Sequence, residues 1–247
     1  MNKQRPYCLS IAGFDPSGGA GVIADCKTFE QLKVNGLSVI TCNTIQTEDN
    51  FYSYNWISNE IILEQLEILL DRYPVKYVKI GLIKDSEILL EILQVLKNKI
   101  LNPIIIWDPI ILPTYADSGI DQNRFINNLQ DVLESVSIIT PNSIEYNKLF
   151  GNNNLEETHL KYNQTIYLKG GHSEEKGRDI LINNGKLFAF NPKTITNLEK
   201  HGTGCIFSSA LLAYLSRGFP LLKSCIRSKA YVEKRIISNR SLLAYHR

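Results

Sequence analysis

The stretch YCLSIAGFDPSGGAGVIADCKTF, residues 7–29, joins a buried strand, a glycine-rich turn and the start of a helix. Residues 7–13 are mostly apolar, which is typical of a strand covered on both faces. Val22, Cys26 and Phe29 follow at helical spacing and predict an amphipathic helix. A strand that passes through such a turn into a helix is the usual first unit of a parallel α/β sheet.

The alternation of strand and helix continues along the chain. We predict strands over residues 7–13, 37–45, 75–81, 103–109, 136–141, 165–171, 178–185 and 186–190. We predict helices over residues 20–34, 58–73, 85–100, 121–134, 143–150, 203–217 and 220–238. The pattern predicts a mainly parallel sheet with helices on both faces. No linker, repeat or low-complexity tract interrupts it, so we expect one domain over residues 1–247.

Composition excludes several classes of function. Lys and Arg number 27 and Asp and Glu number 25, so the net charge of +2 leaves no basic footprint for nucleic acid. No apolar run is long enough for a membrane span or a signal peptide. The five cysteines are scattered and form no CxxC pair, which fits reduced thiols in the cytoplasm better than disulfides or a zinc site.

The motif HGTGC, residues 201–205, places Gly202 and Gly204 directly before a predicted helix. The free amides and the dipole of a helix start suit a phosphate or the charge that develops during phosphoryl transfer. The same dipole should lower the pKa of the Cys205 thiol and make Cys205 a possible proton acceptor. The alternative is a glycine-rich turn before a packed helix, with Cys205 as a small apolar filler.

The turn after the first strand is the second candidate site. The strand ends at Gly13, and the glycines that follow allow a ligand to approach the backbone closely. Asp25 lies near the start of the next helix, where its carboxylate could accept from a ligand amine or hydroxyl. The alternative is that Asp25 only caps or solvates the helix.

Further polar residues stand at predicted strand ends, where ligands of parallel sheets bind. Gln46 can donate and accept, which suits the edge of a nitrogen heterocycle, although a solvated glutamine is the commoner case. Asp108, Asn142 and Glu145 could hold Mg²⁺ through water and phosphate, with helix capping as the alternative for Asn142. Lys169 could contact phosphate.

Taken together, these stretches resemble the hydroxymethylpyrimidine/phosphomethylpyrimidine kinases of thiamine biosynthesis, which belong to the ribokinase-like superfamily. The resemblance covers nearly the whole chain. It rests on IAGFDPSGGAGVIADCKTF, SVITCNTIQT, VKIGLI, DP after an apolar strand, ITPNSIE, LKGGH and HGTGC, which occur in the family's order.

The resemblance implies a three-layer α/β/α sandwich in which ATP, with Mg²⁺, phosphorylates a pyrimidine alcohol and then its monophosphate. The amides of Gly202, Thr203, Gly204 and Cys205 would form an anion hole over the γ-phosphoryl group. Cys205 matches the position of an aspartate base in the sugar kinases, so it would accept the hydroxymethyl proton. The remaining implied contacts are Gly13, Asp25, Gln46 and Leu82 for the pyrimidine, and Asp108, Asn142, Glu145 and Lys169 for nucleotide, phosphate and Mg²⁺. A homodimer is also implied.

Two departures from the family bear on this reading. Relatives commonly carry VMVAKSG after DP, whereas here residues 112–119 lack that lysine, which could weaken the second phosphorylation. Before HGTGC, where relatives often have a small polar pair, this chain has Glu199-Lys200; Lys200 either offers charge to phosphate or is solvated.

Two alternatives remain at this point. A pyridoxal or pyridoxine kinase of the same superfamily would act on a similarly flat heterocycle with a hydroxymethyl arm. A catalytically silent protein that senses the pyrimidine or the vitamin would fit the altered residues 112–119, but it would have no need for Cys205.

Overall fold

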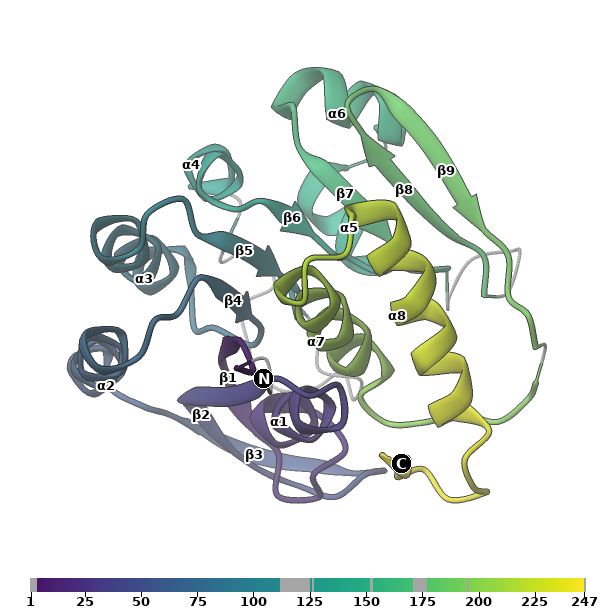
Figure 1. Ribbon diagram of the computed structural model, residues 1–247, viewed down its shortest axis with the longest axis horizontal. Coiled ribbons are helices and arrows are strands. Elements are labelled where there is room, and N and C mark those ends of the chain that lie inside the picture. Colours follow the sequence, from purple (N-terminus) through teal and green to yellow (C-terminus); the bar gives the residue numbers. More distant parts are fainter. Residues whose placement is uncertain are drawn as a thin grey trace.

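A single sheet of nine strands runs through the described part of the chain (Figure 1). This computed structural model describes residues 4–111, 125, 127–151, 153–170, 177–194 and 196–246. Neighbouring strands are parallel from β2 to β7, and antiparallel only where β3 and the β8–β9 pair extend the two edges. The spatial order is β3 (Phe51–Trp56), β2 (Asn35–Gln46), β1 (Tyr7–Phe14), β4 (Tyr77–Ile80), β5 (Ile104–Trp107), β6 (Ile138–Ile139), β7 (Thr165–Leu168), β8 (Asp179–Asn183) and β9 (Lys186–Phe190).

Helices cover both faces of the sheet, which confirms the predicted α/β/α sandwich. One apolar cluster joins the sheet to α1 (Gly21–Gln31), α7 (Thr203–Ser216) and α8 (Leu221–Ile236). The other joins it to α2 (Asn59–Arg72), α3 (Ser86–Lys99), α4 (Leu129–Ser135), α5 (Ser143–Phe150) and α6 (Leu155–Tyr162). Among the described helices, none has the length and apolar character needed to cross a membrane.

The strands supply both clusters because successive side chains point to opposite faces. In β5, Ile105 and Trp107 belong to the cluster under α2–α6, whereas Ile106 belongs to the cluster under α1, α7 and α8. The continuous apolar run of this strand therefore reflects burial on both sides. The predicted segment 103–109 is confirmed as a central strand.

Several local predictions need correction. Sequence reasoning missed β3, which follows a turn after β2, and α6, which begins with a capping box between Asn154 and Glu157. The first helix ends at Gln31, short of the expected residue 34, because Lys33 adopts a left-handed φ of +63°. Only Ile138–Ile139 of the expected strand 136–141 pair as a strand. Asn184 and Gly185 form the turn of the β8–β9 hairpin, with φ values of +50° and +70°.

Part of the expected helix over residues 121–134 lies outside the described residues, and α4 begins at Leu129. Residues 112–119, where the missing lysine could weaken the second phosphorylation, also lie outside the described residues.

Candidate active site

A cavity of about 510 Å³ opens beyond the carboxyl ends of the parallel strands. This is the place where open α/β sheets bind ligands. The cavity extends from the ends of β1 and β2, past the start of α7, to α8. Eleven of the twelve residues singled out from the sequence line it: Gly13, Gln46, Leu82, Asp108, Asn142, Glu145, Lys169, Gly202, Thr203, Gly204 and Cys205.

The start of α7 meets the turn after β1 at the middle of this cavity. Gly202 is the N-cap residue with a φ of +75°, and no side chain caps the helix. The first amides of a helix have no partner within it, so these amides can receive an anion. A Cβ atom on Gly202 would lie only 2.0 Å from the carbonyl oxygen of Gly19. The two glycine-rich motifs are therefore in direct backbone contact.

The Gly202→Ala substitution is expected to disturb this contact severely. The new methyl group meets a backbone oxygen that cannot rotate away, and the left-handed φ adds about 1–2 kcal/mol of strain. We expect kcat to fall at least tenfold and the melting temperature to drop by several degrees. Gly218→Ala is the matched control, because Gly218 has a φ of +84° but nothing within 4 Å of a Cβ atom. Equal losses in the two variants would contradict the role of the contact.

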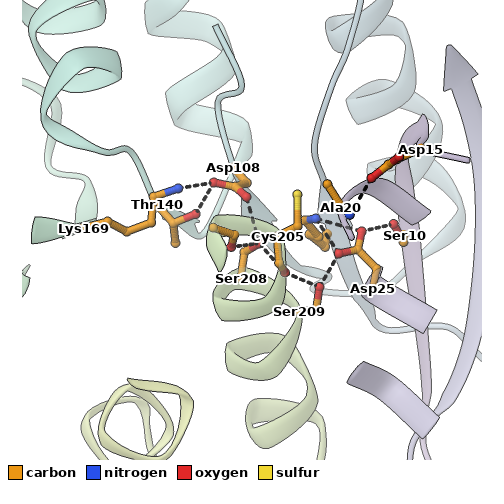
Figure 2. A network of polar contacts seen from close by, with 12 residues as sticks. Ser10, Asp15, Ala20, Asp25, Asp108, Thr140, Lys169, Cys205, Ser208 and Ser209 are labelled. Carbon is orange, nitrogen blue, oxygen red and sulfur yellow. Dashed lines mark hydrogen bonds and ion pairs between the residues drawn. The ribbon is translucent and has the colours of Figure 1, made fainter. Parts of the chain in front are cut away.

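Lys169 and two carboxylates form a charged cluster beside the start of α7. Figure 2 shows the first of these pairs, between Lys169 and Asp108. Lys169 Nζ lies 2.7 Å from Asp108 Oδ1 and 3.8 Å from Glu145 Oε2. It would also lie 3.1 Å from a Cβ atom on Gly204. The ammonium group is thus placed next to the helix-start amides, where it adds positive charge for a phosphoryl group.

The surroundings shift the pKa values of the two carboxyl groups in opposite directions. Burial alone would raise the pKa of Asp108, but the ammonium groups of Lys169 and Lys79 hold it below its ordinary value. Thr140 Oγ1 and Ser208 Oγ also donate to Asp108, at 3.1 and 2.9 Å. For Glu145, burial raises the pKa to about 7, and Lys169 offsets only part of this effect. Asp108 is therefore ionised near neutral pH, and Glu145 is poised to change its charge there.

Asn142 caps the start of α5, which is the alternative that the sequence offered for this residue. Its side chain accepts from the Glu145 amide at 2.9 Å, and Glu145 Oε2 accepts from the Asn142 amide at 2.7 Å. This capping box begins α5 and leaves both residues on the cavity wall. Asn142 and Glu145 thus cap the helix and line the cavity at the same time.

The prediction for the pKa of Cys205 is wrong. The side chain is only 5% exposed, and this burial raises the pKa of the thiol to about 11. The positive charge of Lys79 opposes the effect, while Asp25 and Asp108 add to it. Burial near two carboxylates therefore raises the thiol pKa more than the dipole of the helix start lowers it. The resting form of Cys205 is the thiol.

The prediction for Asp25 also needs correction, because its carboxylate does not reach the cavity. Asp25 is fully buried and accepts from Lys79 Nζ at 2.7 and 2.8 Å. Ser10 Oγ donates to it at 2.5 Å, and Ser209 Oγ donates as well (Figure 2). Ser209 Oγ also lies 2.6 Å from the carbonyl oxygen of Cys205, so its single proton is shared between the two acceptors. Asp25 therefore supports the wall behind Cys205, and no lone pair faces a ligand.

Sequence reasoning missed a hydrogen bond between Asp15 and His201 that links the two motifs. Asp15 Oδ2 lies 2.9 Å from His201 Nε2 and accepts from the Ala20 amide at 2.8 Å. Burial alone would raise the pKa of Asp15, but these bonds and those from Ser17 lower it to about 2. Both residues line the cavity. One indication of this contact was present in the sequence: Asp15 and His201 each belong to one of the two glycine-rich motifs that were candidate sites.

The sandwich fold and this cavity, in which helix-start amides, a lysine and two carboxylates meet, define a ribokinase-like small-molecule kinase. The profile of the family described as phosphomethylpyrimidine kinase matches residues 15–246. The hydroxymethylpyrimidine/phosphomethylpyrimidine kinase of Aquifex aeolicus (strain VF5) is 30% identical over 246 residues, 95% of each chain. The chain belongs to the phosphomethylpyrimidine kinase family.

Solved structures agree with this assignment. The crystal structure of phosphomethylpyrimidine kinase from Clostridium difficile 630 superimposes with a TM-score of 0.77 at 30% identity, over 94% of this chain and 100% of that one. The pyridoxal kinase from Staphylococcus aureus in complex with ADP gives a TM-score of 0.84 at 23% identity, over 99% of this chain and 94% of that one. At that identity the second likeness shows the shared fold.

Proposed function

We propose that this chain uses ATP to phosphorylate 4-amino-5-hydroxymethyl-2-methylpyrimidine and then its monophosphate, in thiamine biosynthesis. The observation that carries the proposal is the cavity itself. It joins one end, lined by Gly13, Gln46 and Leu82, to the helix start with Lys169. Family membership supports the choice of the pyrimidine over other flat heterocycles.

In the proposed reaction, the hydroxymethyl oxygen attacks the γ-phosphorus of ATP and ADP leaves. The transition state is loose, so positioning and charge stabilisation do most of the work. The amides of Thr203, Gly204 and Cys205 and the ammonium group of Lys169 would hold the transferring phosphoryl group. The resting Cys205 thiol would first lose its proton to solvent in the open cavity, and the thiolate so formed would accept the alcohol proton, which leaves late in the transfer.

The pyrimidine end of the cavity supplies shape and hydrogen bonds. Leu82 is nearly buried and contacts Gly13, so it would pack against one face of the ring. Gln46 ends β2, where its amide would pair with the ring nitrogen and the exocyclic amine. The hydroxymethyl arm would then point toward the start of α7.

Magnesium is part of the same proposal. Within the described residues, no group of three or more His, Cys, Asp or Glu side chains is arranged to hold a metal ion. Mg²⁺ at phosphate sites keeps several waters and takes only one or two carboxylates, so Asp108 and Glu145 fit it. They would hold the ion through water, with Asn142 beside them. When bound, Mg²⁺ would neutralise charge on the ATP phosphates.

The proposal also covers assembly and compartment. We take residues 1–247 as one catalytic domain, in keeping with the single sheet. A homodimer and a cytoplasmic location remain proposals; the first is supported by the exposed Ile45 and Tyr52 on the β2–β3 edge, and the second by five free cysteines. Light scattering of the purified protein tests the dimer.

The direct test is to incubate the purified protein with MgATP and hydroxymethylpyrimidine, its monophosphate or pyridoxal, and to identify products by mass. We expect mono- and diphosphate from the pyrimidine. Monophosphate alone would restrict the activity to the first step and point to residues 112–119. Preferential phosphorylation of pyridoxal would assign the vitamin B6 alternative instead. Binding without any product would favour the sensor and remove the catalytic assignment.

A further inference from the structure

Residues 238–246, called here the tail segment, fold back after α8 as an ordered loop. Asn239 Nδ2 donates to the Leu243 carbonyl at 2.9 Å, and the Tyr245 amide donates to Ser238 Oγ at 3.0 Å. Ser241 Oγ donates to Asn239 Oδ1 at 2.9 Å. These internal bonds give the segment a defined shape without a helix or strand.

Lys200 fastens the tail segment to the residues that precede the anion hole. Its Nζ donates to the Asn239 carbonyl at 2.8 Å, to Asn239 Oδ1 at 3.3 Å and to the Ser241 carbonyl. An ammonium group has three N–H donors, so all three are used within the protein. Lys200 is only 7% exposed. It is therefore neither solvated nor free to donate directly to a phosphate, which excludes both alternatives left by the sequence.

The neighbouring residue continues the same attachment. The His201 amide donates to the Leu242 carbonyl at 2.9 Å, while the His201 ring pairs with Asp15. A Cβ atom on Gly19 would lie 2.5 Å from the His201 ring and 3.0 Å from Leu243 Cδ2. The tail segment thus packs against both glycine-rich motifs at the point where they meet.

We propose that the tail segment is a positioning element for the anion hole, with Lys200 as the residue that holds it in place. Gly202 lacks a side chain and a side-chain cap, so the direction of the following amides depends on how residues 200 and 201 are held. Helix-start amides stabilise a transition state only when their placement is fixed within a fraction of an ångström. The proposal rests on the proposed kinase function, and it assigns a positioning role to Lys200 and Leu242, which line the cavity but are not among the proposed substrate contacts.

The test is a double-mutant cycle with Lys200→Met, a stop after Ser238, and their combination. We expect each single variant to lower kcat about 10- to 100-fold while the affinity for the unphosphorylated pyrimidine changes less than about twofold. The combined variant should lose no more than the worse single variant, because both changes break one attachment. Lys186→Met, at an exposed lysine on β9, is the control and should behave as wild type.

Amide hydrogen exchange gives a readout that does not need activity. Lys200→Met should speed exchange in residues 201–206 and leave exchange in β1 and β4 unchanged. If the protein phosphorylated no substrate but exchange changed as expected, the attachment would stand and the kinase assignment would fall. Wild-type kcat and exchange in Lys200→Met, or losses that multiply in the combined variant, would overturn the proposal. If the shortened chain does not fold, the kcat and the amide hydrogen exchange of Lys200→Met alone test the proposal.

Discussion

Cys205→Ala is expected to lower kcat by about 100- to 10,000-fold while leaving pyrimidine affinity within a few-fold of wild type. The range is what a positioned general base typically contributes to a proton transfer. Binding should persist because Gln46 and Leu82, which are expected to contact the ring, lie on other elements of the cavity wall. Single-turnover kinetics with MgATP and calorimetry with the pyrimidine measure the two effects separately.

Because the Cys205 pKa is about 11, the pH dependence of turnover is a second part of this prediction. In the proposed mechanism the active form is the thiolate, and at pH 8 only about one thiol in a thousand is ionised. The wild-type rate should therefore rise with pH from 7 upward, by up to about tenfold per unit, until another step becomes limiting. Cys205→Ala should show a flat profile above about pH 8, where Glu145, with a pKa of about 7, is already ionised.

The control for this variant is Cys26→Ala, a half-buried cysteine on α1 that does not line the cavity. It should retain wild-type kcat and the same pH profile. Normal turnover by Cys205→Ala would remove the base assignment, and an equally steep profile in that variant would assign the titration to another group.

Lys79→Met is expected to lower the free energy of unfolding by about 3–5 kcal/mol. The change leaves the Asp25 carboxylate buried without its counterion, and removing one partner of a buried pair typically has this effect. Adding Asp25→Asn should recover much of the loss, since the amide oxygen still accepts from one of Ser10 and Ser209 and the amide nitrogen can donate to the hydroxyl oxygen of the other. Urea denaturation of the single and double variants measures both values.

A surface ion pair of the same length provides the comparison. Lys99 Nζ also lies 2.7 Å from a carboxylate, that of Asp71, but the two side chains are 38% and 65% exposed. Lys99→Met should therefore change stability by less than about 1 kcal/mol. If Lys79→Met were as mild as Lys99→Met, the buried pair would not be a main support of the wall behind Cys205.

Periodicity and strand-end positions predicted most of the fold and the location of the site. The apolar run at 103–109 could be recognised as a central strand because burial on both faces leaves no alternation. Gln46 and Asp108 could be placed together because parallel strands bring their carboxyl ends to one edge.

Long-range partners and the degree of burial could not be predicted from local patterns. Asp25 looked like a ligand contact because its partner, Lys79, stands 54 residues away on β4. The signal was present, since a lysine inside a strand buried on both faces requires a buried counterion. No sequence feature of this kind indicates how deeply Cys205 is buried. That burial reverses the expected shift of the Cys205 pKa.

The backbone contact between Gly19 and Gly202 has a consequence for how the protein is made. The two motifs are separated by most of the polypeptide, so neither can acquire its working shape while the other is missing. During synthesis, which proceeds from the N-terminus, the first motif must wait until α7 has emerged. Ligand binding should therefore appear late and abruptly on a series of stalled nascent chains, and N-terminal fragments that stop before α7 should bind no pyrimidine.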